Sequence, residues 1–143
     1  MVRVAAVSTN RFGQCLRAAC DVPVGTLVET FSGPVMPYAD VPEAEVRHAL
    51  LLDGDRWLVP ESDARYINHA CEPNCRIEPG SRVVTTQAVQ AGEEFTINYH
   101  RVTAAEMRED PAAFFWDPRW SFDCACGSPA CVGRVDGYRM DGE

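Results

Sequence analysis

The sequence predicts a single domain of mainly β structure with short helices, and three observations support this. Short runs of β-branched and aromatic residues recur along the chain, with Gly, Pro, Asn and Asp between them. Only two stretches have the apolar spacing or the capping pattern of a helix. With 143 residues, 46% of them hydrophobic, the chain can bury one core.

The first part of the chain contains three predicted strands. Residues 2–7 alternate weakly between apolar and polar side chains and predict a strand, and the turn residues within 8–13 end it. Residues 14–20 and 26–31 predict two further strands. Because Pro and Gly lie between these two, we expect a turn that pairs them with each other.

The middle of the chain predicts a loop, a short helix and a strand. Residues 37–42 contain two prolines and an aspartate, which indicates a loop. Residues 43–52 place apolar side chains at helical spacing after an acidic first turn, which favours a short helix with His48 on its surface. The Asp-Gly-Asp turn at residues 53–55 then leads into a strand at residues 56–59.

The second half predicts two strands, residues 82–89 and 94–99, each after a turn that contains glycine. A capping box begins at Thr103 and predicts a short helix that Pro111 limits. Aromatic residues are dense in residues 112–120, and we expect them to pack in the core or to cover a pocket.

The charge of the chain argues against nucleic-acid binding. The formal net charge is −8, and the 13 Lys and Arg residues are scattered without a run, so we expect no direct contact with phosphates. An acidic surface would instead raise the local concentration of a cationic partner, such as a Lys-bearing peptide or a polyamine. The sequence leaves the oligomeric state open.

The apolar runs of the chain are short. None approaches the roughly 18 residues of a membrane-spanning helix, and the apolar N-terminal run is too brief for a signal sequence. We therefore expect a soluble, cytoplasmic protein without a membrane segment. Its seven cysteines cannot all pair, and in a cytosolic chain a cysteine cluster more often binds metal than forms disulfides.

The eleven residues 65–75, Arg-Tyr-Ile-Asn-His-Ala-Cys-Glu-Pro-Asn-Cys, hold more chemically active side chains than an ordinary turn. Two asparagines and a histidine bring hydrogen-bonding groups, and Cys71 and Cys75 bring two potential thiolates. The plain alternative is a surface turn with two buried cysteines. The cysteine-rich tail argues against that alternative, because the two segments look like halves of one site.

The tail offers three thiols within eight residues: Cys124, Cys126 and Cys131. Zinc takes four tetrahedral ligands, so three thiols need a fourth from elsewhere in the chain. The candidates for the fourth thiolate are Cys15, Cys20, Cys71 and Cys75. Because Cys71 and Cys75 lie in the 65–75 stretch, we expect one of these two to hold the tail against that stretch.

Several segments resemble the SET-domain family of lysine methyltransferases, in the family's order. Residues 65–75 look like its central motif, residues 92–99 (Gly-Glu-Glu-Phe-Thr-Ile-Asn-Tyr) resemble its tyrosine-bearing strand, and the tail resembles the post-SET zinc motif. Upstream, residues 13–25 are similar to the family's Gly-x-Gly strand. The resemblance thus covers nearly the whole chain, with a SET domain at residues 1–108 and a post-SET zinc-binding segment at residues 109–143 packed on it as one unit.

The resemblance implies a β-clip fold of small sheets around a knot-like crossing, in which the Asn-His segment is threaded through a loop formed by a preceding segment. It implies two cofactors, S-adenosyl-L-methionine and Zn2+. By the motif match Tyr99 is the catalytic tyrosine, Ile97 and Tyr99 line the substrate channel, and Cys71 rather than Cys75 is the fourth zinc ligand. The implied cofactor-binding residues are Gly13, Gln14, Cys15, Tyr66, Asn68, His69 and Phe122. The implied metal ligands are Cys71, Cys124, Cys126 and Cys131.

Some positions depart from the family's pattern. Cys15 stands where the second glycine of the Gly-x-Gly motif is expected, and a side chain there can crowd the approach to the cofactor. Ile97 takes the place of the Phe or Tyr that governs how many methyl groups are added. Asn98 replaces the usual Asp, and Ala70 replaces the usual Ser.

The first functional hypothesis is an S-adenosylmethionine-dependent N-methyltransferase that acts on a lysine side chain of a basic protein or peptide. In it Asn68 would bind the adenine edge through its amide or its backbone, and His69 would contact the cofactor or anchor the crossing. One alternative is an N-methyltransferase of a free amine or small peptide in specialised metabolism, and another is a non-catalytic SET-fold binding module. The intact Tyr99 argues against the binding module, whereas no residue separates the first two hypotheses.

Overall fold

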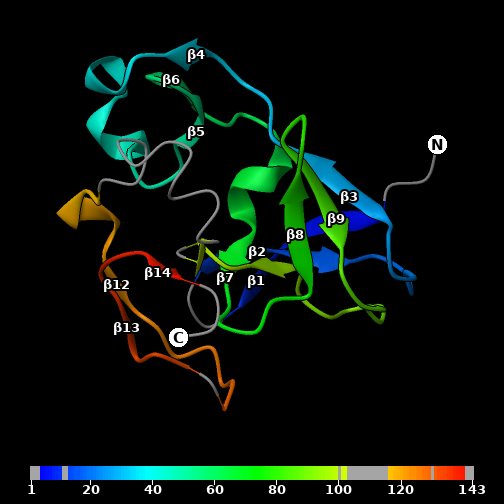
Figure 1. Cartoon of the computed structure of the whole chain (residues 1–143). Helices are drawn as coiled ribbons and strands as arrows, with labels where there is room; N and C mark the ends of the chain where they lie inside the picture. The colour runs from blue at the N-terminus through cyan, green and yellow to red at the C-terminus, as the bar shows by residue number, and fades with distance from the viewer. Residues whose placement is uncertain (1–3, 11–12, 100, 103–115, 130, 141–143) are drawn as a thin grey trace.

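The computed structural model describes residues 4–10, 13–99, 101–102, 116–129 and 131–140. Within these ranges the chain is mainly β with short 3-10 helices, as predicted (Figure 1). The strands described there form four two-stranded sheets and two three-stranded sheets. None of the described helices is long and apolar enough to cross a membrane.

The elements are short throughout the described ranges. The strands are β1 (Ala5–Asn10), β2 (Gly13–Ala18), β3 (Leu27–Thr30), β4 (Val35–Met36), β5 (Leu50–Asp53), β6 (Arg56–Leu58), β7 (Asn68–His69), β8 (Cys75–Glu78), β9 (Arg82–Thr85), β10 (Thr96–Ile97), β11 (Arg101–Val102), β12 (Phe122–Asp123), β13 (Arg134–Val135) and β14 (Arg139–Met140). The 3-10 helices are η1 (Tyr38–Asp40), η2 (Glu43–Glu45), η3 (Asp63–Tyr66) and η5 (Pro118–Trp120). The helix predicted from Thr103 lies outside the described residues.

Strands β1 and β2 form an antiparallel hairpin, in which Ala5 pairs with Ala18 and Asn10 pairs with Gly13. The first strand therefore lies three residues later than predicted. The polar residues Ser8 and Thr9, which suggested a turn, continue the ladder. Their side chains suit a strand whose outer positions are exposed or half-buried.

The predicted pairing of residues 14–20 with residues 26–31 is wrong. β3 pairs with β9, and β9 pairs with β8, so that these three strands form one antiparallel sheet (Figure 1). The segment after β2 pairs with the segment after β9, because Val22 exchanges two backbone hydrogen bonds with Val89 at 2.8 and 2.9 Å. The segment after β2 thus carries the chain from one sheet to another, where a short hairpin turn was expected.

The main core lies between this sheet, the hairpin and the residues around β7 and β10. Its fully buried side chains include Leu16, Ile67, Val83 and Phe95. Cys75 also packs in this core, with 2% of its surface exposed. Burial of these side chains is the main force that holds the small sheets together, because sheets of two or three strands are marginal alone.

The helix predicted for residues 43–52 is wrong beyond its first turn. Only η2 is helical, and the three leucines that follow enter β5, which forms a hairpin with β6. Gly54 has φ +48 in the turn, a conformation that glycine adopts readily. Leu51 pairs with Trp57, which is 3% exposed in a second small core. Strand pairing and this burial outweigh a weak helical periodicity.

The segment predicted as one strand at residues 94–99 changes its partner halfway. Backbone hydrogen bonds of 2.8 Å join Glu93 to Ala18 and Phe95 to Leu16 of β2. Beyond them, β10 pairs in parallel with β7. The segment with Asn68 and His69 and the segment that ends at Tyr99 therefore lie side by side. We call β7, β10 and the residues between Glu94 and Tyr99 the crossing.

Candidate functional site

A cavity of about 910 Å³ lies against the crossing. Its first wall comes from β7, η3 and β10, and its second from the region around β5 and β6. Its third wall comes from the C-terminal segment of residues 116–129 and 131–135, which we call the arm. The aromatic lining residues, which make much of the wall apolar, are Phe31, Trp57, Tyr99, Trp116, Trp120, Phe122 and Tyr138.

Tyr99 lies in this cavity with its hydroxyl hydrogen-bonded to the backbone carbonyl of Ile67. Its backbone N–H donates to His69 Nδ1 at 3.0 Å. Desolvation, and then the charge of Glu94, raise the pKa of Tyr99 well above its ordinary value. The hydroxyl is therefore protonated at neutral pH, with its oxygen held in a fixed position.

Three aromatic rings meet at the crossing. The ring centroids of His69 and Tyr99 are 5.4 Å apart, and Phe122 of the arm lies 5.5 Å from His69 and 6.1 Å from Tyr99. Since His69 Nδ1 accepts a hydrogen bond, the neutral ring carries its proton on Nε2, which lies 3.5 Å from Cys71 Sγ. His69 thus connects the Tyr99 backbone to the cysteine cluster.

Asn68 stands between the large cavity and a second cavity of about 430 Å³. Its amide nitrogen donates to the Gln14 carbonyl at 3.0 Å and to Glu94 Oε1 at 2.8 Å. These two bonds use both amide protons, so the amide oxygen is the group of this side chain that can accept a hydrogen bond from a ligand. The backbone of Asn68 pairs with Thr96 in the crossing.

Glu94 is a residue of the site that the sequence reasoning missed. Its carboxylate accepts hydrogen bonds from Asn68 and from Asn10 Nδ2, the latter at 3.0 and 3.1 Å, and it lines the second cavity together with Arg17. The signal was present in the sequence, because Glu94 belongs to the 92–99 motif. Nothing in the sequence, however, indicated that the hairpin would bring Asn10 to it.

The other predicted cofactor-binding residues lie close to the cavities but do not line them. Gly13 and Gln14 are exposed at the start of β2, and Tyr66 is half-buried at the end of η3. Cys15 is fully buried, and desolvation raises the pKa of its thiol. The predicted crowding by Cys15 is therefore not visible in the lining of either cavity.

The four predicted metal ligands come together. The Sγ atoms of Cys71, Cys124, Cys126 and Cys131 all lie within 4.8 Å of one another. Desolvation raises the pKa of Cys71 and of Cys124, because these thiols lie in a largely apolar cluster. Cys75 lies apart in the main core, where burial raises its pKa to about 12.

Asn98 joins the crossing to this cluster. Its amide nitrogen donates to the backbone carbonyl of Cys71 at 3.4 Å. The Asp that the family usually has here could accept but, when ionised, could not donate. Asn98 in place of Asp thus supplies the N–H donor that the Cys71 carbonyl accepts from.

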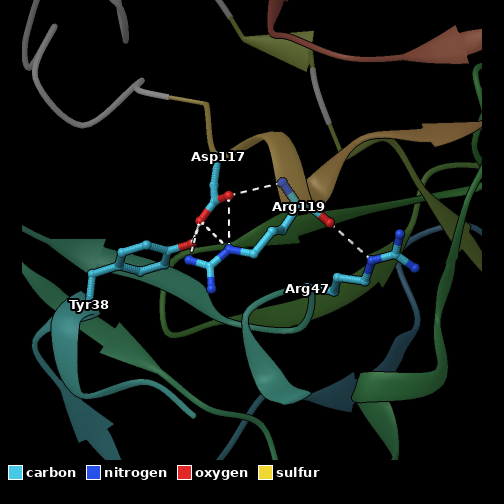
Figure 2. A network of polar contacts seen from close by, with 4 residues as sticks. All are labelled: Tyr38, Arg47, Asp117 and Arg119. Carbon is cyan, nitrogen blue, oxygen red and sulfur yellow. Dashed lines mark hydrogen bonds and ion pairs between the residues drawn. The ribbon is translucent and has the colours of Figure 1, made fainter. Parts of the chain in front are cut away.

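The arm reaches the region around β5 and β6 through polar side chains, which Figure 2 shows. Tyr38 donates to Asp117 Oδ2 at 2.6 Å, and Arg47 Nε donates to the Arg119 carbonyl at 3.0 Å. His48, which was expected on the surface, is half-buried and lines the cavity. Desolvation, and then the charge of Arg65, lower its pKa.

The fold and this site define a small β domain whose tyrosine-containing cavity has an arm as one wall, and the arm contributes three thiols of a four-cysteine cluster. The family described as SET domain matches residues 13–100, more than half of the chain. The chain therefore belongs to the SET-domain family. A crystal structure from Plasmodium falciparum has a similar fold, with a TM-score of 0.60 and 15% identity, over 69% of this chain and 95% of that chain.

Relatives with similar sequences are named histone-lysine N-methyltransferases. The H3 lysine-36 specific protein of Cryptococcus neoformans is 28% identical over 156 residues, which cover 92% of this chain and 16% of that protein. Human SETD2 is 26% identical over 153 residues, which cover 94% of this chain and 6% of that protein. The ash1 protein of Drosophila melanogaster is 32% identical over 95 residues, or 62% of this chain. The chain thus spans a small part of the length of these relatives.

Proposed function

We propose that this chain is an S-adenosylmethionine-dependent N-methyltransferase that acts on a lysine side chain of a protein. The observation that carries the proposal is the position of Tyr99, whose hydroxyl is held by the Ile67 carbonyl inside a largely apolar cavity. Family membership and the names of the relatives support the same reaction. Neither the position of Tyr99 nor the similarity to these relatives favours a free amine as the acceptor, and neither favours a non-catalytic binding module.

The residues around the cavity suit the needs of methyl transfer to an amine. Bound S-adenosylmethionine would supply an electrophilic methyl group. Lysine is normally protonated, with a pKa of about 10.4, and an apolar wall such as that formed by Ile97 and Phe31 favours the neutral amine by desolvation. The Tyr99 oxygen can then orient the amine, because its O–H donates a hydrogen bond to the Ile67 carbonyl and its lone pairs can accept one from the amine.

The polar residues of the second cavity fit the charged parts of this cofactor. The Glu94 carboxylate and the Arg17 guanidinium both line that cavity, so they offer complementary charges to an ammonium and a carboxylate. Asn68, whose amide protons are both used within the protein, lines the same cavity. We place the cofactor against Asn68 and His69, the two residues that line both cavities from the crossing.

Zinc is the metal that the four-thiol cluster suits best. Four cysteine sulfurs within 4.8 Å of one another are the donor set of a structural zinc site, with all positions filled by protein. A divalent cation would also offset the desolvation that opposes thiolates at Cys71 and Cys124. The ion would hold the arm against the crossing and would take no part in the transfer.

The acceptor is proposed from the relatives and from charge. Because those proteins are named as histone-lysine methyltransferases, a basic histone tail is the first acceptor to test. The formal net charge of −8 would favour the encounter with such a tail.

Transfer of a labelled methyl group to histone H3, to an H3 peptide with every lysine replaced by arginine, and to small polyamines tests the proposal. We expect label on histone H3 alone. Label on the polyamines at a higher kcat/KM would identify a small-amine enzyme. No transfer to any acceptor, with binding of the cofactor retained, would identify a binding module.

A further inference from the structure

We infer that Tyr38, Arg47, Asp117 and Arg119 form a clasp that holds the arm in place as a wall of the cavity, so that Tyr38 and Asp117 are positioning residues for the acceptor. This inference rests on the proposed function only where it concerns the acceptor. The clasp itself is a structural feature that can be tested without any methyl transfer.

The clasp joins two segments that are far apart in the sequence (Figure 2). Tyr38 Oη donates to Asp117 Oδ2 at 2.6 Å, a bond across 79 residues. Arg47 Nε donates to the Arg119 carbonyl at 3.0 Å, and its Nη2 donates to the Ser121 carbonyl at 3.4 Å. Three side-chain hydrogen bonds thus connect η1 and the residues after η2 to the start of the arm.

Arg119 fixes the carboxylate that Tyr38 contacts. Its guanidinium donates to Asp117 Oδ2 at 2.6 Å, and its backbone N–H donates to Oδ1 at 2.9 Å. These bonds to Arg119 keep the pKa of Asp117 well below its usual range, so the carboxylate is ionised at neutral pH. A hydrogen bond to an ionised acceptor is stronger than one between neutral groups, so the Tyr38 contact is a charge-assisted link, as are the two bonds that the Arg47 guanidinium donates.

The clasp closes over a cluster of aromatic rings from both segments. The Tyr38 ring lies 4.6 Å from that of Trp57 and 5.8 Å from that of Trp120, and Trp116 lies 5.5 Å from Trp120. Trp57, Trp116 and Trp120 are all the tryptophans of the chain. Intrinsic tryptophan fluorescence therefore reports on this junction alone.

The residues of the clasp divide into two groups by their position. Arg47 lines the cavity and could touch a ligand directly, whereas Tyr38 and Asp117 are not among the lining residues. An effect of Asp117 on the acceptor must therefore pass through the arm, whose Trp120 and Phe122 form part of the wall, and an effect of Tyr38 must pass through the arm or through Trp57, which also lines the cavity. This difference makes Tyr38 and Asp117 the informative positions to change.

The test compares Tyr38→Phe and Asp117→Asn with the wild-type chain, each loaded with zinc. Tyr38→Phe removes only the hydroxyl and keeps the ring, so it is expected to fold. Both variants should shift the tryptophan emission to longer wavelength and increase its quenching by acrylamide, because the rings become accessible to water. The matched control is Glu78→Gln, which changes a carboxylate in an exposed 2.7 Å ion pair with Arg76 on β8. Its fluorescence should equal that of the wild-type chain.

A kinetic comparison then tests the positioning role with the H3 peptide as acceptor. Loss of a hydrogen bond to a charged group should raise the acceptor KM about tenfold in Asp117→Asn. The kcat should change less than about twofold, because the hydrogen bonds of Tyr99 to Ile67 and His69 are untouched. A smaller rise of KM in the same sense is expected for Tyr38→Phe.

Three outcomes would overturn the inference. Unchanged fluorescence in Tyr38→Phe would show that the arm is held without the clasp, and this variant decides the matter if Asp117→Asn does not fold. Altered fluorescence with an unchanged KM would show that the clasp does not position the acceptor. A fall in kcat without a rise in KM would show that Tyr38 and Asp117 act on the methyl-transfer step and do not position the acceptor. Fluorescence still reports on the clasp if the wild-type chain transfers no methyl group, so failure of the proposed function is distinguishable.

Discussion

The crossing and the arm face each other across one cavity, but they are held in different ways. The crossing is built from backbone pairing, and the buried Asn74 fixes it further by donating to the Glu94 carbonyl at 2.9 Å and accepting from the Thr96 N–H at 2.9 Å. The arm has its own small hairpin, β12 with β13, and contacts the rest of the chain through side chains. The methyl transfer that we propose depends on the crossing, and access of the acceptor to Tyr99 depends on the arm.

This contrast teaches where the molecule is rigid and where it can be perturbed. Phe95 and Ile97 of the crossing lie in the main core, so a change there disturbs the whole fold. The thiols of the arm belong to a separate small cluster with Val135. Changes in the arm should therefore alter the cavity while leaving the main core folded.

The largest effect is expected for Tyr99→Phe, which tests the crossing and leaves the arm intact. Loss of the hydroxyl should lower turnover about 100-fold or more, the magnitude typical of removing one oriented polar group from a reaction centre. The aromatic contacts of the ring remain possible, so binding of S-adenosylhomocysteine should be retained. Transfer of labelled methyl measures the first quantity and calorimetry the second. Equal turnover in the variant would remove Tyr99 from the catalytic role.

The next effect separates two cysteines of the same stretch. Cys71→Ser should abolish stoichiometric zinc and loosen the arm, because metal binding is coupled to folding of its ligands. Cys75→Ala should keep zinc and lose about 1 kcal/mol of unfolding free energy from a small core cavity. Metal analysis and denaturant unfolding of the two variants measure these changes. Chelation of the wild-type chain should reproduce the result of Cys71→Ser, and zinc-free wild-type protein would refute the metal site.

A smaller effect is expected for Glu94→Gln, which weakens two side-chain hydrogen bonds at the crossing. Its carboxylate accepts from Asn10 and Asn68, and the neutral amide would lose the charge that strengthens both bonds. We expect an affinity for S-adenosylhomocysteine about tenfold lower by calorimetry. Glu93→Gln is the matched control, since Glu93 accepts from the Gln90 N–H in an exposed turn. Equal losses in both variants would contradict a specific role of Glu94.

The sequence predicted the crossing better than the arm, and the reason is physical. Asn68, His69, Cys71 and Tyr99 lie in two short motifs, and the motif match brought them to one site as the structure does. The four-thiol cluster followed partly from counting ligands and partly from the resemblance. These signals are readable because each motif is local in the sequence, even though the motifs meet only in the fold.

Contacts between side chains from separate segments could not be predicted from the sequence. Nothing in the residues around Tyr38 or Arg47 indicates that their partners lie in the arm, because Tyr and Arg are ordinary surface residues. The helix predicted across Leu50 failed for a related reason, since its strand partner is supplied by the tertiary fold. Local pattern thus identified reactive groups, whereas long-range packing decided what surrounds them.

The smallest effect is expected at the contact between the two regions, in Asn98→Asp. The amide of Asn98 donates to the Cys71 carbonyl, and an ionised carboxylate there would place acceptor against acceptor. We expect a loss of about 1 kcal/mol in unfolding free energy at neutral pH, and faster release of zinc to a chelator. The loss should shrink as the pH falls through the pKa of the new carboxyl group, because the protonated form can donate again. Asn98→Ala removes the donor without adding a charge. Its unfolding free energy at neutral pH should therefore lie between those of the wild-type chain and of Asn98→Asp, and it should not show this pH dependence. If the Asp variant is as stable as the wild-type chain at neutral pH, the hydrogen bond from Asn98 to the Cys71 carbonyl does not contribute to the stability of the fold.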